Sequence, residues 1–451
     1  MEINPVVSEN DLAQSLTVLK EAIPVSPKNI APSVTAFDEV SLHAIFAAAR
    51  ILKSVVHHTP LQPNLLYSEE YGANILFKRE DMQVVRSYKI RGAYNKMASL
   101  RPETLKNGIV CASAGNHAQG VAWSCRKMQV RGTIFMPHTT PRQKLKQVQF
   151  FGKEYVELVL SGDTFDAAFE LATAHAAEYN KTFIHPFDDS GVIAGQATVG
   201  VEIFNDAETP IDYLLVPIGG GGLAAGMVSY FRHVSPATKI IGVEPLGAPA
   251  MKQSIEKGEN TTLKDIDKFV DGAAVKRVGD LTFSICRKAL DRVLAIPEGK
   301  VCTTMLKLYN EAAIVAEPAG ALSIAALDEI KEEIKGKTVV CVLSGGNNDI
   351  TRTEEIRERS LLYEGVKHYF MIRFAQRSGA LRDFLNNVLG PNDDIVRFEY
   401  MQKNNRETGP ALVGLELKDR EDFVSLMAKM EQRGINYEYL NDKPDLFQFL
   451  L

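Results

Sequence analysis

The segment "DYLLVPIGGGGLAAGMVSYF", residues 212–231, joins a short apolar run to a helical pattern through four consecutive glycines, Gly219, Gly220, Gly221 and Gly222. A short apolar run bounded by turn residues is typical of a strand buried on both faces. Glycines let backbone amides converge, and the helix that follows adds positive partial charge at its N-terminus. The segment therefore predicts a strand, a phosphate-sized anion site and a helix, although a sharp turn that needs small residues would give the same pattern. Neither the G-x-G-x-x-G spacing with its distal acid nor a Gly-Lys-Ser/Thr sequence is present, which argues against a dinucleotide site and a nucleotide P-loop.

The same alternation of strand and helix patterns extends along most of the chain. Strand-like apolar runs lie at residues 73–80, 108–113, 131–137, 154–160, 239–245 and 338–346. Helical spacing of apolar residues is found at residues 38–56, 116–128, 140–152 and 163–180. This order predicts an α/β architecture with largely parallel sheets.

The two ends of the chain differ in character from this central part. Residues 1–37 contain four prolines and are interpreted as an arm. Residues 351–366 are charged and helical, which suggests a linker helix, and residues 367–451 follow the order β-α-β-β-α-β with the first helix ending at Gly390. That order predicts a ferredoxin-like α+β module. Since the module shows no nucleophile–base pair and no metal cluster, we interpret it as a regulatory or assembly domain.

Composition narrows the class of protein. The 451 residues are 45% hydrophobic and 24% charged with a formal net charge of -5, and no basic patch suggests nucleic-acid binding. The five cysteines lack C-x-x-C spacing, which predicts reduced, mostly buried thiols. Without a secretory signal or an apolar run long enough for a membrane helix, we expect a soluble cytoplasmic protein with no membrane contact.

Two further loops are expected beside the glycine loop, because ligands of open α/β sheets bind at the carboxyl ends of strands. In "ASAGNHAQG", residues 112–120, Ser113 and Asn116 could contact a ligand above a helix start. In "LSGGNND", residues 343–349, Ser344 ends an apolar strand, although a serine there is common as a simple cap. His117 lies in the first turn of a helix, where a lone histidine is more often structural than catalytic.

One lysine, Lys89 in "SYKIRGA", lies among residues that form no lysine-rich surface. A lysine in a partly desolvated pocket has a lowered pKa and can form a Schiff base with a cofactor aldehyde. Lys78 and Lys96 have ordinary charged neighbours and are interpreted as solvated surface amines. The loops and Lys89 together therefore suggest a phosphorylated cofactor that reacts with an amine.

The segments "SYKIRGA", "SAGNHAQG", "GGGGL" and "SGGNND" resemble the signature segments of pyridoxal-phosphate enzymes of the tryptophan-synthase-β fold type. More narrowly, they and the segments "HTPL" and "IGVEP" are similar to biosynthetic threonine dehydratases, from about residue 40 to the C-terminus. Tyr88 stands where many relatives have phenylalanine, and "SGGNND" where some have "SGAN". The resemblance implies fold type II, with two open twisted α/β subdomains in a catalytic domain of residues 38–350, the smaller at roughly 81–185. It also implies pyridoxal 5'-phosphate as the cofactor. No metal ligand is expected among the site residues, and a requirement for a monovalent or divalent cation is left open.

The resemblance assigns roles residue by residue. Lys89 forms the Schiff base with the cofactor, and Tyr88 before it also binds the cofactor. Asn116 binds the 3'-oxygen of the cofactor ring, and Ser344 meets the pyridine nitrogen. The phosphate is bound by the backbone amides of Gly219, Gly220, Gly221, Gly222 and Leu223. The substrate carboxylate is faced by Ser113, Ala114 and Gly115.

These roles imply a β-elimination. A serine hydroxyl does not stabilise a strongly protonated pyridine as a carboxylate would, so the ring withdraws electrons only moderately. Lys89 would remove the Cα proton of L-threonine, and the β-hydroxyl would leave with a proton from the cofactor phosphate. The products would be 2-oxobutanoate and ammonia, and L-serine is left open as a second substrate.

The C-terminal module resembles the ACT-like regulatory domain of these enzymes, present once. The resemblance implies the first committed step of isoleucine biosynthesis, a homotetramer, and isoleucine as an allosteric inhibitor that binds near Gly379 and Leu381. The module could instead serve assembly alone. Catabolic threonine/serine dehydratases and serine racemases share the catalytic segments but usually lack such a module. An amino-acid-sensing protein on the same scaffold is the non-enzymatic alternative.

Overall fold

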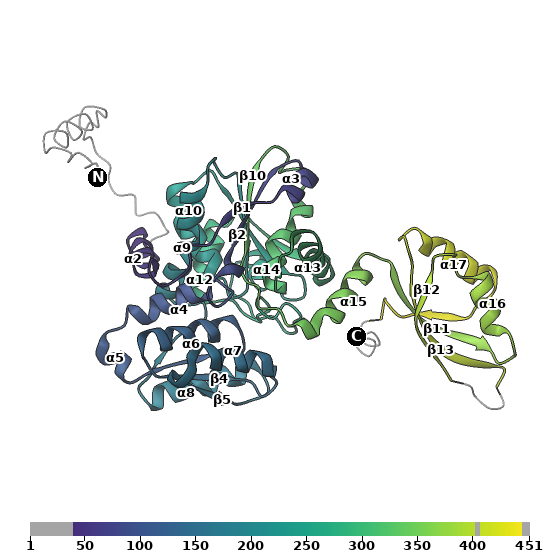
Figure 1. Ribbon diagram of the computed structural model, residues 1–451, viewed down its shortest axis with the longest axis horizontal. Coiled ribbons are helices and arrows are strands. Elements are labelled where there is room, and N and C mark those ends of the chain that lie inside the picture. The colour runs from purple at the N-terminus through teal and green to yellow at the C-terminus, as the bar shows by residue number, and fades with distance from the viewer. Residues whose placement is uncertain (1–38, 402–405, 444–451) are drawn as a thin grey trace, which may run out of the picture. The chain divides into compact units, whose positions relative to one another are not determined.

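The computed structural model describes residues 39–401 and 406–443 (Figure 1). The arm expected at residues 1–37 and the last residues of the C-terminal module, 444–451, lie outside the described residues. The α/β fold with a C-terminal antiparallel domain is confirmed, because two sheets of mainly parallel strands are followed by one antiparallel sheet.

The large sheet has six strands in the order β1-β2-β10-β7-β8-β9. All neighbouring strands are parallel except β1, which pairs antiparallel with β2. The strands are β1 (Leu61–Pro63), β2 (Asn74–Arg79), β7 (Tyr213–Pro217), β8 (Lys239–Pro245), β9 (Arg292–Ile296) and β10 (Thr338–Leu343). Associated with this sheet are α2 (Leu42–Leu52), α3 (Leu65–Tyr71), α9 (Ser190–Asp206), α10 (Gly222–Val234), α11 (Ala250–Lys257), α12 (Asp280–Ala289), α13 (Glu298–Ala312) and α14 (Pro318–Ala325).

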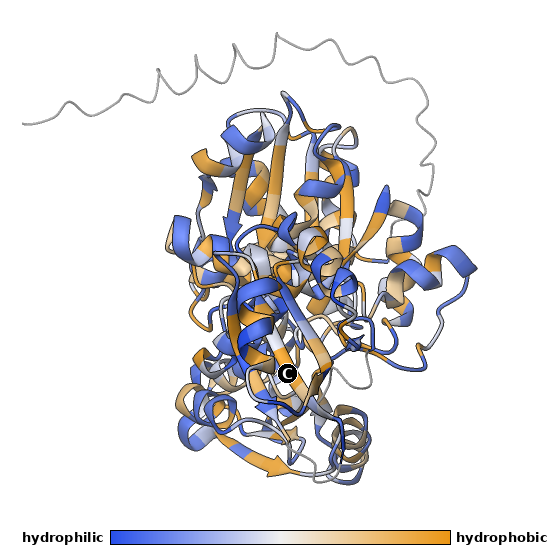
Figure 2. Ribbon diagram, turned by 90° about the vertical axis from the view of Figure 1, so that its right-hand side faces the viewer, coloured by the Kyte–Doolittle hydropathy of each residue, from blue (hydrophilic) through white to orange (hydrophobic). Residues whose placement is uncertain are grey.

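The small sheet has four parallel strands in the order β5-β4-β3-β6. Its strands are β3 (Ile109–Ala112), β4 (Gly132–Met136), β5 (Val156–Leu160) and β6 (Thr182–Phe183), and its helices are α4 (Lys89–Ala98), α5 (Pro102–Lys106), α6 (Asn116–Met128), α7 (Arg142–Gly152) and α8 (Phe165–Glu178). Alternate residues of β3 face opposite sides: Ile109 and Cys111 pack with α6 and α7, while Val110 and Ala112 pack with α8. Both faces of the small sheet are therefore covered by helices, which explains why its strands are continuous apolar runs in the sequence. Figure 2 shows that hydrophobic residues concentrate along strands.

The C-terminal module follows the predicted order around a four-stranded antiparallel sheet, β12-β13-β11-β14. It contains β11 (Lys367–Ala375), α16 (Ala380–Asn387), β12 (Asp394–Tyr400), β13 (Thr408–Glu416), α17 (Asp422–Gln432) and β14 (Tyr437–Tyr439). Helix α15 (Thr353–Tyr363) precedes it. The first helix ends at Asn387, three residues before the glycine at which the sequence pattern placed its end.

Three strands were not predicted from the sequence, namely β1, β6 and β9. Strands β1 and β6 have only three and two residues, too few for an apolar run. Strand β9 has four consecutive apolar residues, as β3 has, but was not singled out in the sequence. All five cysteines are free and buried, as predicted. Within the described ranges, no helix has both the length and the apolar character needed to span a membrane.

Candidate active site

Lys89 is the first residue of α4, and its half-buried side chain donates a hydrogen bond from Nζ to the carbonyl oxygen of Pro186 at 2.9 Å. Burial lowers the pKa of Lys89 to about 8, and the carboxylate of Glu317 partly offsets this shift. The N-terminus of a helix is also a position that disfavours positive charge. Lys89 is therefore an amine that loses its proton near neutral pH, as a nucleophile or general base requires.

The chain around Tyr88 is joined directly to the loop that follows β10. The Tyr88 amide donates to the Ser344 carbonyl at 3.2 Å, and the Gly346 amide donates to the Arg86 carbonyl at 2.9 Å. Ser344 is buried, and its hydroxyl donates to the carbonyl of Ala319 at 3.3 Å. These contacts bring Ser344, predicted to meet a ring nitrogen, next to the residue that precedes Lys89.

The asparagine loop joins the same cluster from the small sheet. Asn116 is the first residue of α6, and its Oδ1 accepts a 2.7 Å hydrogen bond from Nδ2 of Asn347. Farther along α6, a Cβ added to Gly120 would lie only 3.1 Å from the backbone nitrogen of Ile90, so a glycine lets α6 approach the first turn of α4. The hydroxyl of Ser113 accepts a 3.2 Å hydrogen bond from the Gly115 amide, which fixes the loop that also includes Ala114.

The glycine loop lies between β7 and α10. Gly221 precedes α10 with φ +94°, a left-handed conformation that favours glycine. The Gly220 carbonyl accepts a 2.7 Å hydrogen bond from the Thr282 hydroxyl. Because the first amides of a helix have no partner within it, the amides that begin α10, through the buried Leu223, can bind an anion.

Residues 186–188 connect the lysine to the glycine loop. Pro186 accepts the hydrogen bond from Lys89, and a Cβ added to Gly220 would lie 2.2 Å from the ring of Phe187. The carboxylate of Asp188 accepts hydrogen bonds from the first amides of α12, including that of Thr282 at 3.1 Å. The four segments singled out in the sequence therefore form one connected site.

Glu317 was not singled out in the sequence analysis. It is 6% exposed, and its Oε1 accepts a 2.6 Å hydrogen bond from Nδ2 of Asn116. Burial, with a smaller contribution from Asp271, raises the pKa of Glu317 to about 7. An acid before "PAG" resembles an ordinary helix start, so only the three-dimensional fold reveals its contact with Asn116.

His117 is buried, and its Nε2 donates to the carbonyl of Ile184 at 2.9 Å. Burial and the nearby Lys89 lower the pKa of His117 to about 3, so the ring is neutral at physiological pH. This environment is that of a residue that positions the chain, in agreement with the structural interpretation of the sequence.

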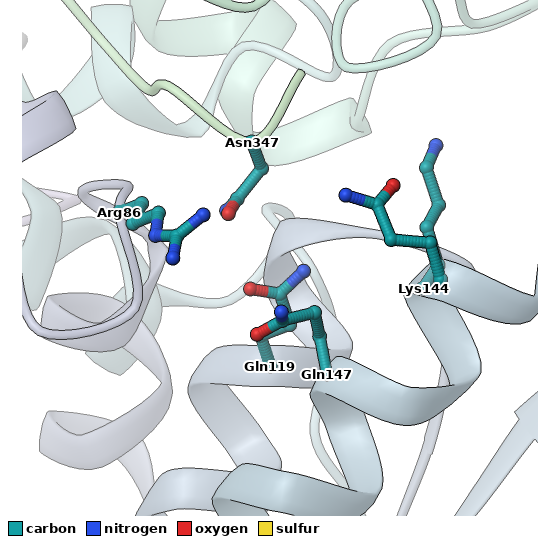
Figure 3. A pocket seen from close by; sticks show the side chains of 6 residues that line it. Arg86, Gln119, Lys144, Gln147 and Asn347 are labelled. Carbon is teal, nitrogen blue, oxygen red and sulfur yellow. The ribbon is translucent and has the colours of Figure 1, made fainter. Parts of the chain in front are cut away.

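A polar pocket is lined in part by Asn347 (Figure 3). Figure 3 shows Gln119 of α6 and Gln147 of α7 on the side facing Asn347 and Arg86. Its lining consists of Arg86, Gln119, Gln143, Lys144, Gln147 and Asn347. Because Asn347 also binds Asn116, this hydrophilic pocket lies next to the loop expected to face a substrate carboxylate.

Lys78 was interpreted as a solvated amine, and that interpretation is wrong. It is fully buried and donates to Glu202 at 2.7 Å and to the carbonyl of Thr59 at 2.6 Å. Arg91, also fully buried, binds both Glu80 and Glu202. Lys78 also lies 3.7 Å from Asp206, so two cations and three carboxylates form a largely buried charge cluster two residues from Lys89. Lys96 is half-buried and pairs with Asp189 at 2.7 Å.

The two residues predicted for regulation lie in the C-terminal module. Gly379 precedes α16 with φ +88°, and Leu381 is 39% exposed. The module's sheet is separate from the two sheets that carry the catalytic segments. Among residues 39–401 and 406–443, no group of three or more His, Cys, Asp or Glu side chains is arranged to hold a metal ion.

Two family models match the chain. The model described as pyridoxal-phosphate dependent enzyme matches residues 52–345, and the model described as C-terminal regulatory domain of threonine dehydratase matches residues 358–450. The chain is 58% identical over 413 residues to the biosynthetic L-threonine dehydratase IlvA of Halalkalibacterium halodurans, which covers 92% of this chain and 100% of that protein. It is 55% identical to the protein of the same name from Bacillus subtilis, over 91% of this chain and 98% of the relative.

Solved structures agree with these matches. The processed form of threonine deaminase isoform 2 from Solanum lycopersicum aligns with a TM-score of 0.69 at 36% identity, over 74% of this chain and 99% of that one. A serine racemase from Dictyostelium discoideum aligns with a TM-score of 0.64 at 31% identity, over 69% of this chain and 100% of that one.

Proposed function

Because the chain belongs to the pyridoxal-phosphate-dependent enzymes, and among them to the threonine dehydratases with a C-terminal regulatory domain, we propose that it commits L-threonine to isoleucine biosynthesis. The reaction is the dehydration and deamination of L-threonine to 2-oxobutanoate and ammonia. The observation that supports this proposal best is Lys89, an amine with a pKa of about 8 tied through Pro186 and Phe187 to the glycine loop.

The residues present fit the cofactor. A side chain at Gly220 would overlap Phe187, and one at Gly222 would come within 2.6 Å of Gln196, so the loop depends on glycines that expose backbone amides. When bound, pyridoxal phosphate supplies an aldehyde that captures the substrate amine and a ring that draws electrons from Cα. Gly219 to Leu223 would hold its phosphate, Asn116 its 3'-oxygen and Ser344 its ring nitrogen.

The chain's own groups then handle the proton. Lys89 Nζ accepts the proton of the substrate Cα, which its lowered pKa permits at neutral pH. Ser113, Ala114 and Gly115 orient the substrate carboxylate at the start of α6. The β-hydroxyl needs a proton to leave as water, and the phosphate held at Gly219 to Leu223 would be its source.

Feedback inhibition by isoleucine at Gly379 and Leu381 is part of the proposal, and α15 supplies a physical connection. Glu358 of α15 accepts a 2.6 Å hydrogen bond from the Tyr369 hydroxyl of β11. The next residue of α15, Arg359, places its guanidinium 4.3 Å from the ring centre of Phe269. The loop that contains Phe269 reaches Ala273, whose Cα would lie 3.0 Å from a Cβ at Gly219. A change in α15 can therefore act on the glycine loop.

The proposal is tested by measuring 2-oxobutanoate formed from L-threonine, with and without isoleucine. We expect turnover that isoleucine suppresses. Racemisation of serine with little 2-oxobutanoate would favour a serine racemase, to which the fold is also similar. Full activity that ignores isoleucine would refute feedback while leaving the catalytic proposal intact. The cytoplasmic location and the homotetramer remain predictions, which fractionation and light scattering can test.

A further inference from the structure

Gln196 is a buried side chain to which the proposed reaction assigns no role. It lies on α9, is 0% exposed, and neither its Oε1 nor its Nε2 has a hydrogen-bond partner among the described residues. Leaving both atoms of a buried amide unpaired is costly, since such groups nearly always have a partner. The amide therefore indicates a ligand that offers both an acceptor and a donor.

The position of Gln196 identifies where that ligand binds. Its Oε1 lies 2.6 Å from the site of a Cβ at Gly222, the first residue of α10. Its Cγ lies 3.0 Å from the site of a Cβ at Gly92, in the first turn of the helix that begins at Lys89. Gln196 is thus wedged between the helix that carries the lysine and the helix N-terminus that would carry the phosphate.

Charge around the glycine loop bears on the form of that phosphate. The side chains that come closest to a Cβ at Gly220, Gly221 or Gly222 are neutral, and at Gly219 the closest atoms are backbone; the four side chains are Phe187, Gln196, Met251 and Thr282. A phosphate there would be held by backbone amides and a helix dipole, which carry only partial charge. Such surroundings favour one negative charge over two.

We propose that Gln196 binds the cofactor phosphate and selects its singly protonated form, in which one oxygen accepts from the amide N–H and the P–O–H donates to the amide oxygen. The inference rests on the proposed function, since it requires that pyridoxal phosphate occupy the glycine loop. A doubly charged phosphate could satisfy only the donor, so the amide oxygen would stay unpaired. A side-chain amide presents one donor and one acceptor in either orientation, so the inference does not depend on which atom is assigned as oxygen.

Binding to the apoprotein tests the contact. Loss of a hydrogen bond to a charged group should weaken the binding of pyridoxal phosphate to Gln196→Met roughly 10- to 100-fold. Binding of pyridoxal, which lacks the phosphate, should change by no more than about 2-fold. The control is Ser229→Ala, which removes a buried, unpartnered hydroxyl on α10, away from the glycine loop. It should change the affinity for neither pyridoxal phosphate nor pyridoxal. Equal losses for both cofactor forms in Gln196→Met would mean that Gln196 only fills space, which overturns the proposal.

The protonation state is tested by phosphorus NMR. A phosphate monoester free in solution loses its second proton near pH 6. The bound phosphate of the wild-type holoenzyme should titrate about 1 pH unit or more above that of Gln196→Met. If the bound phosphate titrates with the same midpoint pH in the two proteins, Gln196 does not select the protonated form and the proposal is overturned.

A second substitution keeps the proposal testable if Gln196→Met does not fold. A protonated carboxyl group offers one donor and one acceptor, as an amide does, whereas a carboxylate repels phosphate. Gln196→Glu should therefore bind pyridoxal phosphate well at acidic pH and lose affinity steeply as pH rises, while pyridoxal binding stays flatter. A pH dependence equal to that of wild type would contradict the proposal. Failure of wild type itself to bind pyridoxal phosphate would instead refute the cofactor assignment.

Discussion

Substitution of Arg91 by methionine should destabilise the protein by an amount that depends on pH. Arg91 Nε donates to Glu80 at 2.9 Å and its Nη1 donates to Glu202 at 2.6 Å. Without Arg91, Glu202 would keep its pair with Lys78, and Glu80 would keep the hydrogen bond from the Thr59 hydroxyl. Breaking a buried ion pair by removing one partner costs about 3–5 kcal/mol. One freed carboxyl can take up a proton, which from a pKa of about 4.3 costs about 4 kcal/mol at pH 7 and about 1 kcal/mol at pH 5. The penalty should therefore be near 3–4 kcal/mol at pH 7 and near 1 kcal/mol at pH 5.

The direction of this pH dependence follows from the charges that remain when Arg91 is removed. Burial alone would raise the pKa of Glu202, but Arg91 and Lys78 lower it below its ordinary value. In the wild type this contribution to stability is present above the pKa of the unfolded chain and is lost only as pH falls through the lower folded value. Without Arg91 the folded carboxyl binds its proton more tightly, so the variant approaches the wild type as pH falls.

Urea unfolding of the apoprotein at pH 7 and at pH 5 measures the loss of unfolding free energy in Arg91→Met at each pH. The single tryptophan, Trp123, lies 6.1 Å from the ring of Tyr94 on α4, so its fluorescence reports on the helix that carries Arg91. Arg292→Met is the matched control, because the pair of Arg292 with Glu333 is exposed and should be worth at most about 1 kcal/mol. A penalty for Arg91→Met that equals this control, or that is the same at both pH values, would refute the reasoning.

Three further substitutions address the glycine loop, the buried acid and the helix before the C-terminal module. Gly220→Ala should weaken cofactor binding to the apoprotein roughly 10- to 100-fold, since its Cβ would lie 2.2 Å from Phe187. Unchanged affinity in a titration of the apoprotein with pyridoxal phosphate would count against the glycine loop as the phosphate site. Because burial raises the pKa of Glu317 to about 7, wild-type stability should fall by about 3 kcal/mol as pH rises from 4.5 through 7, and Glu317→Gln should lack this fall in urea titrations. Arg359→Met should weaken inhibition by isoleucine about 2- to 30-fold with turnover retained, whereas the exposed Glu354→Gln should not; equal inhibition curves would exclude coupling through α15.

The parts of the fold that could be predicted were those with strong local patterns. Strands β4 and β7 are buried along their whole length, so each reads as a short apolar run that only a sheet covered on both faces explains. The loops beside Gly222 and Asn116 were evident because each follows such a run and opens a helix. Strand β9, "RVLAI", was missed although its four apolar residues form a run as long as that of β3.

Side-chain surroundings could not be predicted in the same way. Lys78 looked solvated because its sequence neighbours are charged, yet Glu202, its partner, lies 124 residues away. Glu317 and Gln196 lie in ordinary helical contexts, and their importance depends on contacts with Asn116 and Gly222 that only the packed helices create. The sequence thus reveals residues whose backbone is unusual, whereas buried polar side chains become visible only in three dimensions.

The central claim is that Lys89 is the amine that bonds to pyridoxal phosphate. Incubation with the cofactor, reduction by borohydride and peptide mass spectrometry test it directly. The account predicts a reduced cofactor adduct on the peptide that contains Lys89, and none in Lys89→Ala. An adduct found instead on Lys96 or another lysine, or persisting in Lys89→Ala, would contradict it.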